Sequence, residues 1–173
     1  MNRLWLGLGA NLGDRGAALQ RAVDALSAAG LEVQAVSTVY QTAPRDMEDQ
    51  PPFLNAACRV RTALAPPEVL ALAKGIEAAA GREAGPRFGP RPIDVDLLVW
   101  EGGVWSGPDL TIPHPRLGDR RFALVPLIDL DPDLMLPDGS RIADLAARIP
   151  VDDQPVEAVL DRLVVPGDPR SGL

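Results

Sequence analysis

This chain of 173 residues has little of three side chains that often build reactive sites: one cysteine, one histidine and one lysine. Because Cys58 is the only cysteine, an internal disulfide and a cysteine-based zinc site are both excluded. A lone thiol among apolar residues is typical of a packed core position in a reducing compartment. We therefore expect a cytoplasmic protein.

Long apolar runs and an excess of positive charge are also missing. No run approaches the roughly 18 residues that a membrane-spanning helix needs, and residues 1–6 enter a strand-like pattern without signal-peptide character. The net charge of −7 disfavours bulk attraction to nucleic acid or to an anionic membrane. We expect a monomer whose partners are small molecules, with neither nucleic acid nor membrane among them.

Two glycine motifs that cradle phosphates are absent as well. Residues 4–8 predict a buried strand, and a turn containing glycine follows at 9–14. Neither G-x-x-x-x-G-K-[ST] nor G-x-G-x-x-G opens the next helix, so we interpret the turn as a tight strand-to-helix connection. Asp14 can cap that helix, whose apolar stripe includes Leu19, Val23 and Leu26.

The strongest pattern that is present is the run RFGPRPIDVDLLVW at residues 87–100. It begins as a loop, because Pro90 and Pro92 disfavour helix. After the second proline, β-branched and apolar residues predict a strand. Residues two apart in a strand share a face, so Asp94 and Asp96 lie on the same side, about 7 Å apart at Cα.

Two carboxylates on one face repel each other unless a cation lies between them. Mg²⁺ prefers oxygen ligands and often shares them with substrate phosphates, and arginine pairs well with phosphate. Arginines form two clusters, each with one acidic neighbour: Arg82, Arg87 and Arg91 with Glu83, and Arg116, Arg120 and Arg121 with Asp119. Local positive charge on an acidic protein indicates a small anionic ligand. The alternative is a strand that starts with two solvated acids.

A strand predicted at 53–62 places Phe53 and Asn55 side by side, next to the polar loop 45–52. The asparagine can bond the edge of a heterocycle or a nearby backbone group, and the loop is either an active-site lid or ordinary surface. His114 lies between two prolines, where a functional role and a structural role are both open.

The predicted elements follow the order strand, helix, strand, strand, helix, strand, at residues 4–8, 14–30, 31–41, 53–62, 66–81 and 93–100. This order fits the ferredoxin-like split βαβ plan. The predicted fold class is therefore α+β, with a mostly antiparallel sheet and helices packed on it in α/β/α layers.

The rest of the chain predicts two helices and an extension. The first helix covers 122–130 with Pro126 in its first turn, and Ser140 caps the second, which runs to about residue 149. Residues 156–165 predict a short helix or a strand. We expect a single domain over 1–150 and a partly mobile C-terminal extension over 151–173.

Five motifs carry a resemblance to a known family: GLGANLGD at 7–14, YQTAP at 40–44, QPPFLNAA at 50–57, RFGPRPIDVD at 87–96, and IPHPR at 112–116 followed by Arg120 and Phe122. In this order they resemble the 6-hydroxymethyl-7,8-dihydropterin pyrophosphokinase family of folate biosynthesis. The motifs extend from residue 4 to about residue 149. The GPR-x-[IL]-D-x-D segment together with the later PHP is highly specific for that family.

The resemblance implies transfer of pyrophosphate from ATP to the hydroxymethyl group of a reduced pterin, with release of AMP. It implies four catalytic residues, Arg82, Arg91, Asp94 and Asp96, and two Mg²⁺ ions held by Asp94 and Asp96. It implies an ATP site made by Glu77, Arg82, Arg87, Phe88, Arg91, Thr111, His114 and Arg120. It implies a pterin site made by Thr42, Ala43, Phe53, Asn55 and Phe122, with Arg87 and Phe88 covering the site when their loop closes.

Three departures from the family pattern concern loop closure rather than the reaction. Family members often carry tyrosine, tryptophan and arginine where this chain has Phe53, Phe88 and Ala84, and residues beyond 150 have no secure counterpart. Two other functions stay open, a metal-dependent phosphohydrolase and a non-catalytic nucleotide-binding module. The group Phe53, Asn55 and Phe122 argues against the first, because a water nucleophile needs no aromatic rings to hold it. The paired acids argue against the second, because binding ATP alone does not require two metals.

Overall fold

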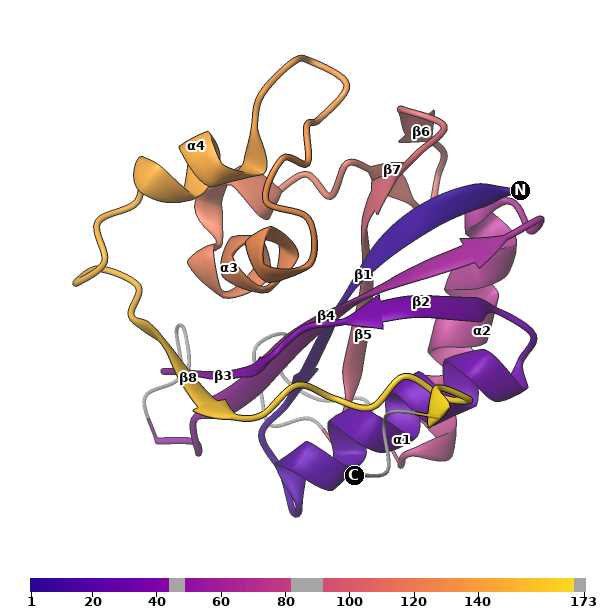
Figure 1. The fold of residues 1–173 in the computed structure, drawn as a ribbon, viewed down its shortest axis with the longest axis horizontal. Coiled ribbons are helices and arrows are strands. Elements are labelled where there is room, and N and C mark those ends of the chain that lie inside the picture. Colours follow the sequence, from indigo (N-terminus) through magenta and orange to yellow (C-terminus); the bar gives the residue numbers. More distant parts are fainter. Residues whose placement is uncertain (44–48, 82–91, 170–173) are drawn as a thin grey trace.

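The computed structural model describes residues 1–43, 49–81 and 92–169 (Figure 1). Its elements up to the acidic strand are β1 (Asn2–Ala10), α1 (Arg15–Ala28), β2 (Glu32–Val36), β3 (Val39–Thr42), β4 (Phe53–Thr62), α2 (Pro66–Ala79) and β5 (Asp94–Trp100). The later elements are β6 (Trp105–Ser106), β7 (Thr111–Ile112), the 3₁₀ helix η1 (Leu117–Asp119), α3 (Arg121–Leu130), α4 (Ile142–Ala147) and β8 (Val156–Leu160). Within the described ranges, no helix has the length and apolar character needed to cross a membrane.

The described strands form a six-stranded sheet in the order β5-β1-β4-β3-β8, with β2 also paired to β4. Every strand pair in this sheet is antiparallel. A small second sheet pairs β6 with β7. The prediction of an α+β, ferredoxin-like fold with an antiparallel sheet is therefore confirmed. Residues 156–160, for which helix and strand were both open, form a strand that lies beside β3 at the sheet edge (Figure 1).

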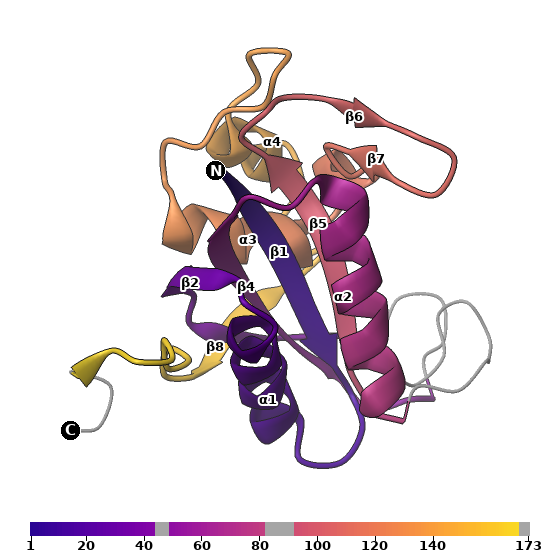
Figure 2. The same cartoon turned by 90° about the vertical axis from the view of Figure 1, so that its right-hand side faces the viewer.

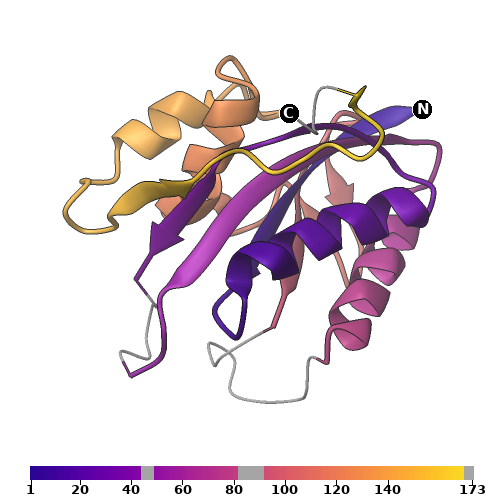
Figure 3. The same cartoon turned by 60° about the horizontal axis from the view of Figure 1, so that its bottom comes forward.

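Alternation along the strands builds one core on each face of the sheet. On one face, side chains such as Leu6 and Cys58 pack against α1 and α2. On the other face, Trp5 and Ala57 pack against α3 and α4. Figure 3 shows the two pairs of helices on opposite sides of the sheet, and Figure 2 shows α1 and α2 next to each other. Burial raises the pKa of the Cys58 thiol to about 12, as expected for the predicted core cysteine.

Local signals place the first helix as predicted but not the strand that follows it. Asp14 caps α1, and its carboxylate accepts a hydrogen bond from the Ala17 N–H at 3.1 Å. The single strand predicted at 31–41 is two strands, β2 and β3, interrupted at Ser37. The Oγ of Ser37 accepts a hydrogen bond from the Ala57 N–H at 2.8 Å, so a side chain enters the backbone ladder at that point.

The starts of the two later helices differ from prediction. Pro126 is the sixth residue of α3 rather than part of its first turn, because the helix already begins at Arg121. There the backbone N–H donates to Oε1 of Gln154 at 3.0 Å, which supplies the acceptor that a helix start requires. Ser140 does not cap α4, since that helix begins after Arg141 without a side-chain cap.

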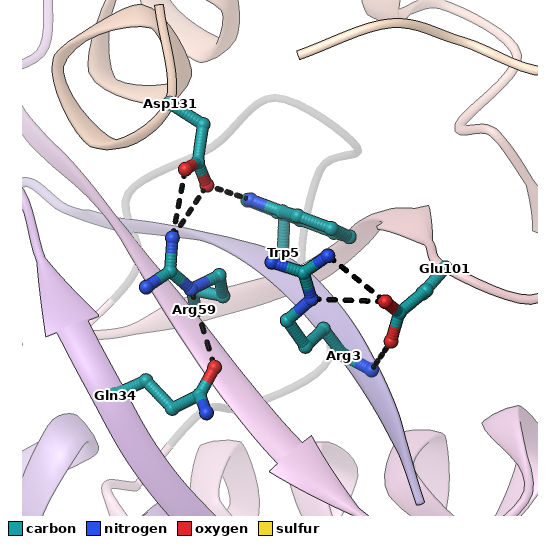
Figure 4. A network of polar contacts seen from close by, with 6 residues as sticks. All are labelled: Arg3, Trp5, Gln34, Arg59, Glu101 and Asp131. Carbon is teal, nitrogen blue, oxygen red and sulfur yellow. Dashed lines mark hydrogen bonds and ion pairs between the residues drawn. The ribbon is translucent and has the colours of Figure 1, made fainter. Parts of the chain in front are cut away.

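A polar network ties α3 to the sheet at the end opposite the acidic strand's start (Figure 4). The carboxylate of Asp131, which follows α3, accepts hydrogen bonds from Trp5 Nε1 and from Arg59 Nη1, the latter at 2.7 and 2.9 Å. Arg59 is 21% and Asp131 26% exposed at the side chain. The neighbouring Arg3–Glu101 pair, at 2.9 Å, is more exposed, at 42% and 38%.

We expect Asp131→Ala to lower the free energy of unfolding by about 1–3 kcal/mol, since it leaves the buried Trp5 indole and the half-buried Arg59 guanidinium without their acceptor. Asp131→Asn keeps an acceptor for the indole and should recover part of the loss. Glu101→Ala is the matched control: it removes a more exposed ion pair, so its effect should stay within about 0–1 kcal/mol. Urea unfolding of the three variants measures this difference, and equal losses for Asp131→Ala and Glu101→Ala would contradict it.

Candidate active site

A cleft of about 600 Å³ opens over β1, β4 and β5 and is bounded by α2, α3 and the segment 108–116. Most of the site residues implied by the sequence line it together. They are Thr42, Ala43, Phe53, Asn55, Glu77, Asp94, Asp96, Thr111, His114, Arg120 and Phe122. Strands, helices and loops that are far apart in sequence therefore contribute to one cavity.

Strand register places one acid of this cleft, Asp94, in the same row as the Asn55 amide. Asp94 of β5 lies opposite Gly9 of β1, and Gly9 lies opposite Asn55 of β4. Neighbouring strands are about 4.8 Å apart, so the acid and the amide are separated by roughly 10 Å across the sheet. Asp96 lies opposite Gly7 in the next row of this face. The cleft thus has an acid end at β5 and an amide end at β4.

The floor between these two ends is bare backbone. A Cβ added at Gly9 would lie 3.2 Å from Asn55 Oδ1, and one added at Gly7 would lie 3.0 Å from Leu98 Cδ1. Both contacts are tighter than ordinary van der Waals packing. The two glycines therefore leave room for the asparagine side chain and for a ligand lying flat over β1.

The amide end is fixed by hydrogen bonds. Asn55 is 6% exposed, and its Nδ2 donates to the Thr42 hydroxyl at 2.7 Å, which orients the amide. This hydrogen bond joins two side chains. The alternative considered for Asn55 from the sequence was a hydrogen bond to a nearby backbone group. Just after β1, Asn11 Nδ2 donates to Gln50 Oε1 at 2.8 Å and to the Pro51 carbonyl at 3.2 Å. These bonds hold the chain that leads into Phe53.

The acid end lies at the start of β5. Asp94 and Asp96 are half-buried on the cleft face, while Val95 and Leu97 are 3% exposed in the core, as the strand pattern predicted. His114 is anchored beside the same strand, because its backbone N–H donates to the carbonyl oxygen of Leu98 at 2.9 Å. Two basic residues that follow it in the chain, Arg116 and Arg120, also line the cleft.

The state of His114 follows from its surroundings. The N–H of Arg116 donates to His114 Nδ1 at 3.1 Å, so in the neutral ring the proton is on Nε2 and can be donated to a ligand. Burial and the positive charges of Arg120 and Arg116 lower the pKa of His114 below its ordinary 6.5, and the Asp94 carboxylate partly opposes them. The ring therefore resists protonation in the protein without ligand.

This depressed pKa predicts a loss of stability in mild acid. The unfolded chain takes up the histidine proton near pH 6.5, while folded His114 does not, so folding weakens as pH falls through that value. Above pH 6.5 the histidine is neutral in both the folded and the unfolded chain, so the full stability is retained there. Urea unfolding of the ligand-free protein at pH 7.5 and pH 5.5 measures this loss. The free energy of unfolding should fall less between the two pH values in His114→Gln than in the wild type. Equal drops in the two proteins would contradict the assignment.

Two observations separate the basic residues of the second cluster. Arg120 Cζ lies 5.5 Å from the ring centroid of Phe122, a cation–π contact at the cleft wall. Arg121 instead donates through Nη1 to the backbone carbonyl of Gln154 at 2.9 Å and is not part of the cleft lining. Of the three arginines, the structure therefore brings Arg116 and Arg120 to the cleft and turns Arg121 away.

A family model described as 7,8-dihydro-6-hydroxymethylpterin-pyrophosphokinase (HPPK) matches residues 5–132. The chain belongs to the HPPK family. The matched range runs from β1 through α3 and so contains every cleft residue named above.

Relatives in the HPPK family match most of this chain. The 2-amino-4-hydroxy-6-hydroxymethyldihydropteridine pyrophosphokinase of Methylorubrum extorquens is 43% identical over 150 residues, which cover 86% of this chain and 94% of the relative. The protein of the same name from Pseudomonas aeruginosa is 37% identical over 151 residues, covering 87% and 93%. Both alignments extend over nearly the full length of the relatives.

Solved structures support the fold. The crystal structure of an HPPK-DHPS in complex with substrates superposes with a TM-score of 0.68 at 15% identity. The match covers 85% of this chain and 43% of that chain, so this protein spans less than half the length of that solved chain. At this identity the similarity concerns the fold alone.

Some HPPK residues expected from the sequence lie outside the described residues, namely Arg82, Arg87, Phe88 and Arg91, as do residues 45–48 of the candidate lid at 45–52. The structure also adds cleft residues that the sequence motifs did not single out. Lys74 lines the cleft one helical turn before Glu77, on the same face of α2. That spacing of three residues was the available signal for it.

Proposed function

We propose that this chain transfers pyrophosphate from ATP to the hydroxymethyl group of 6-hydroxymethyl-7,8-dihydropterin, giving the pterin diphosphate and AMP in folate biosynthesis. The single observation that carries the proposal is the shared cleft, in which a two-carboxylate end and an amide end flanked by aromatic rings lie across three strands. Membership of the HPPK family supports the same reaction. The protein is further proposed to act as a monomer in the cytoplasm.

The amide end is proposed to bind the pterin. Asn55, oriented by Thr42, would bond the polar edge of the ring, and the backbone of Thr42 and Ala43 would add contacts. Phe53 and Phe122 both line this end and would stack on the two faces of the ring. A flat heterocycle is the ligand class that such an arrangement binds best.

The other end is proposed to bind ATP. His114 and Arg120 would contact its phosphates, through the Nε2 proton and the guanidinium respectively, and Glu77 and Thr111 would hold the nucleoside. Glu77 is 4% exposed, near the C-terminal end of α2. Arg82, Arg87, Phe88 and Arg91 belong to the chain that joins α2 to β5, and we propose that Arg82 and Arg91 act in the chemical step.

The acid end fits Mg²⁺. Two half-buried carboxylates share a strand face. Among the described residues, this cleft included, no group of three or more acidic, histidine or cysteine side chains could hold a metal. Asp94 and Asp96 would hold two ions whose other ligands are phosphate and water oxygens. Such ions supply charge neutralisation and alignment of the attacking and leaving oxygens.

The chain's own residues then provide position rather than covalent chemistry. The stacked pterin presents its hydroxymethyl group toward the acid end, while the cationic side chains orient the triphosphate and stabilise its charge. Pyrophosphoryl transfer depends chiefly on such positioning and electrostatic stabilisation.

One assay tests this function against its two rivals. The protein is incubated with ATP, Mg²⁺ and the hydroxymethyl pterin, and the adenine products are separated. Formation of AMP that depends on the pterin supports the proposal. ADP or inorganic phosphate formed without pterin would indicate a phosphohydrolase, and no turnover at all would indicate a binding module.

A further inference from the structure

Gln154, in the C-terminal segment, forms hydrogen bonds with the chain that carries the cleft residues Arg120 and Phe122. Gln154 Oε1 accepts a hydrogen bond from the Arg121 N–H at 3.0 Å, and its Nε2 donates to the Asp119 carbonyl at 2.9 Å. Its backbone carbonyl accepts from Arg121 Nη1 at 2.9 Å. The three bonds therefore hold Asp119 and Arg121, the residues on either side of Arg120. Phe122 follows directly after Arg121.

The Gln154 side chain takes the place of a local N-cap for α3. The residue before α3, Arg120, has extended backbone and makes no capping bond with its side chain. The first N–H groups of a helix need acceptors, and the Gln154 amide provides one for Arg121. The start of α3, from which Arg120 and Phe122 reach the cleft, is thus set by a residue more than thirty positions away.

The same segment also contacts the other wall of the amide end. Val156 of β8 lies opposite Thr42 of β3 in the sheet. Between the two walls, residues 153–156 enclose a small cavity of about 110 Å³ together with Thr42, Ala43 and Phe122. Residues 153–156, on the chain that runs from α4 to β8 (Figure 1), therefore contact both the strand and the helix that would hold the pterin between them.

We propose that Gln154 is a positioning residue for the acceptor side of the reaction. It holds the start of α3 in place through Asp119 and Arg121, and it thereby sets the position of Phe122 against the pterin and the affinity for that ligand. The identity of the ligand rests on the proposed function. Gln154 lies beyond residue 132, where the family match ends.

The chain offers a matched control in Gln20 of α1. Its Nε2 donates to the Val164 carbonyl at 3.0 Å, and its Oε1 accepts from the Val164 N–H at 2.9 Å. Gln20 and Gln154 are both half-buried, and each holds a backbone segment through two amide hydrogen bonds, but Gln20 is not in the cleft lining. Gln20→Ala therefore removes an equivalent contact of the C-terminal segment at a distance from the site.

The test compares Gln154→Ala with Gln20→Ala for Tm, for the KM of pterin and ATP, and for pterin binding by calorimetry without turnover. Both variants should lower Tm by similar amounts. Gln154→Ala should weaken pterin binding and raise its KM roughly tenfold, as expected when a hydrogen-bonded wall loosens, while Gln20→Ala leaves both within about twofold. Gln154→Glu keeps the acceptor for Arg121 but loses the donor to Asp119, so it should fall between wild type and Gln154→Ala.

Amide hydrogen exchange gives a readout independent of the reaction. The Arg121 N–H should exchange faster in Gln154→Ala and be unchanged in Gln20→Ala. Unaltered pterin affinity in Gln154→Ala, or equal losses in both alanine variants, would overturn the positioning role. Absence of pterin-dependent AMP formation by the wild-type protein would instead reject the proposed function, and the exchange result would still show whether Gln154 holds the start of α3.

Discussion

Asp94→Ala and Asp96→Ala should each reduce kcat to less than about a tenth of the wild-type value, which is a barrier increase of more than roughly 1.4 kcal/mol. The two carboxylates share the cleft face of β5, and β1 presents only Gly9 and Gly7 opposite them. Removing either acid deletes half of the proposed Mg²⁺ ligand pair. The fold should survive, since loss of one acid also relieves like-charge repulsion in the ligand-free protein.

The experiment measures kcat at saturating ATP and pterin while Mg²⁺ is titrated, together with urea unfolding of each variant. Asp109→Ala is a matched control, because Asp109 is an exposed acid at the rim of the same cleft. It removes the same formal charge and should leave kcat within about twofold. A rate above one tenth of wild type in Asp94→Ala or Asp96→Ala would rule out the metal assignment, as would an equal loss in Asp109→Ala.

Asn55→Ala should weaken pterin binding by about 1–3 kcal/mol, or roughly five- to 150-fold, because a polar ligand edge loses its buried partner. ATP binding should change little, since the amide lies about two strand spacings, roughly 10 Å, from the acid end. Thr42→Val removes the hydroxyl that accepts a hydrogen bond from Asn55 Nδ2 at 2.7 Å. It should shift pterin affinity in the same direction by a smaller amount.

Calorimetry with each ligand separately distinguishes a binding role of Asn55 from a structural one. A structural asparagine would lower the affinity for both ligands equally and would lower Tm in proportion. If Thr42→Val weakened pterin binding more than Asn55→Ala, the hydroxyl rather than the amide would be the principal contact. The expected order is a large effect for Asn55→Ala, a smaller one for Thr42→Val, and none for either on ATP.

Much of the fold could be predicted because its signals are local. The two-residue period along residues 53–62 placed Phe53 and Asn55 side by side, and both line the cleft. The same period placed Asp94 and Asp96 on one face of the next strand, and both acids line the cleft too. Asp14 marked the start of α1 through a bond to a residue three positions on. Motif order also identified the family, which comparison with known proteins confirmed.

Several features depended on partners distant in sequence, which periodicity does not encode. The split of the strand predicted at 31–41 follows from a bond between Ser37 and Ala57 on another strand. The early start of α3, which leaves Pro126 in its interior, follows from the acceptor that Gln154 supplies. Residues 156–160 carry a pattern that fits helix or strand, and the open edge of β3 made them a strand.

The sequence by itself determined the fold class and the family, and it supplied the candidate site residues, because these follow from local spacing and from motifs. Only the tertiary structure decided how those side chains meet. Strand register put Asp94, Gly9 and Asn55 in one row, and helix packing brought Lys74 to the cleft. It also turned Arg121 toward Gln154 and left Arg120 facing the site, although adjacent arginines in a basic cluster look equivalent until a specific acceptor separates them.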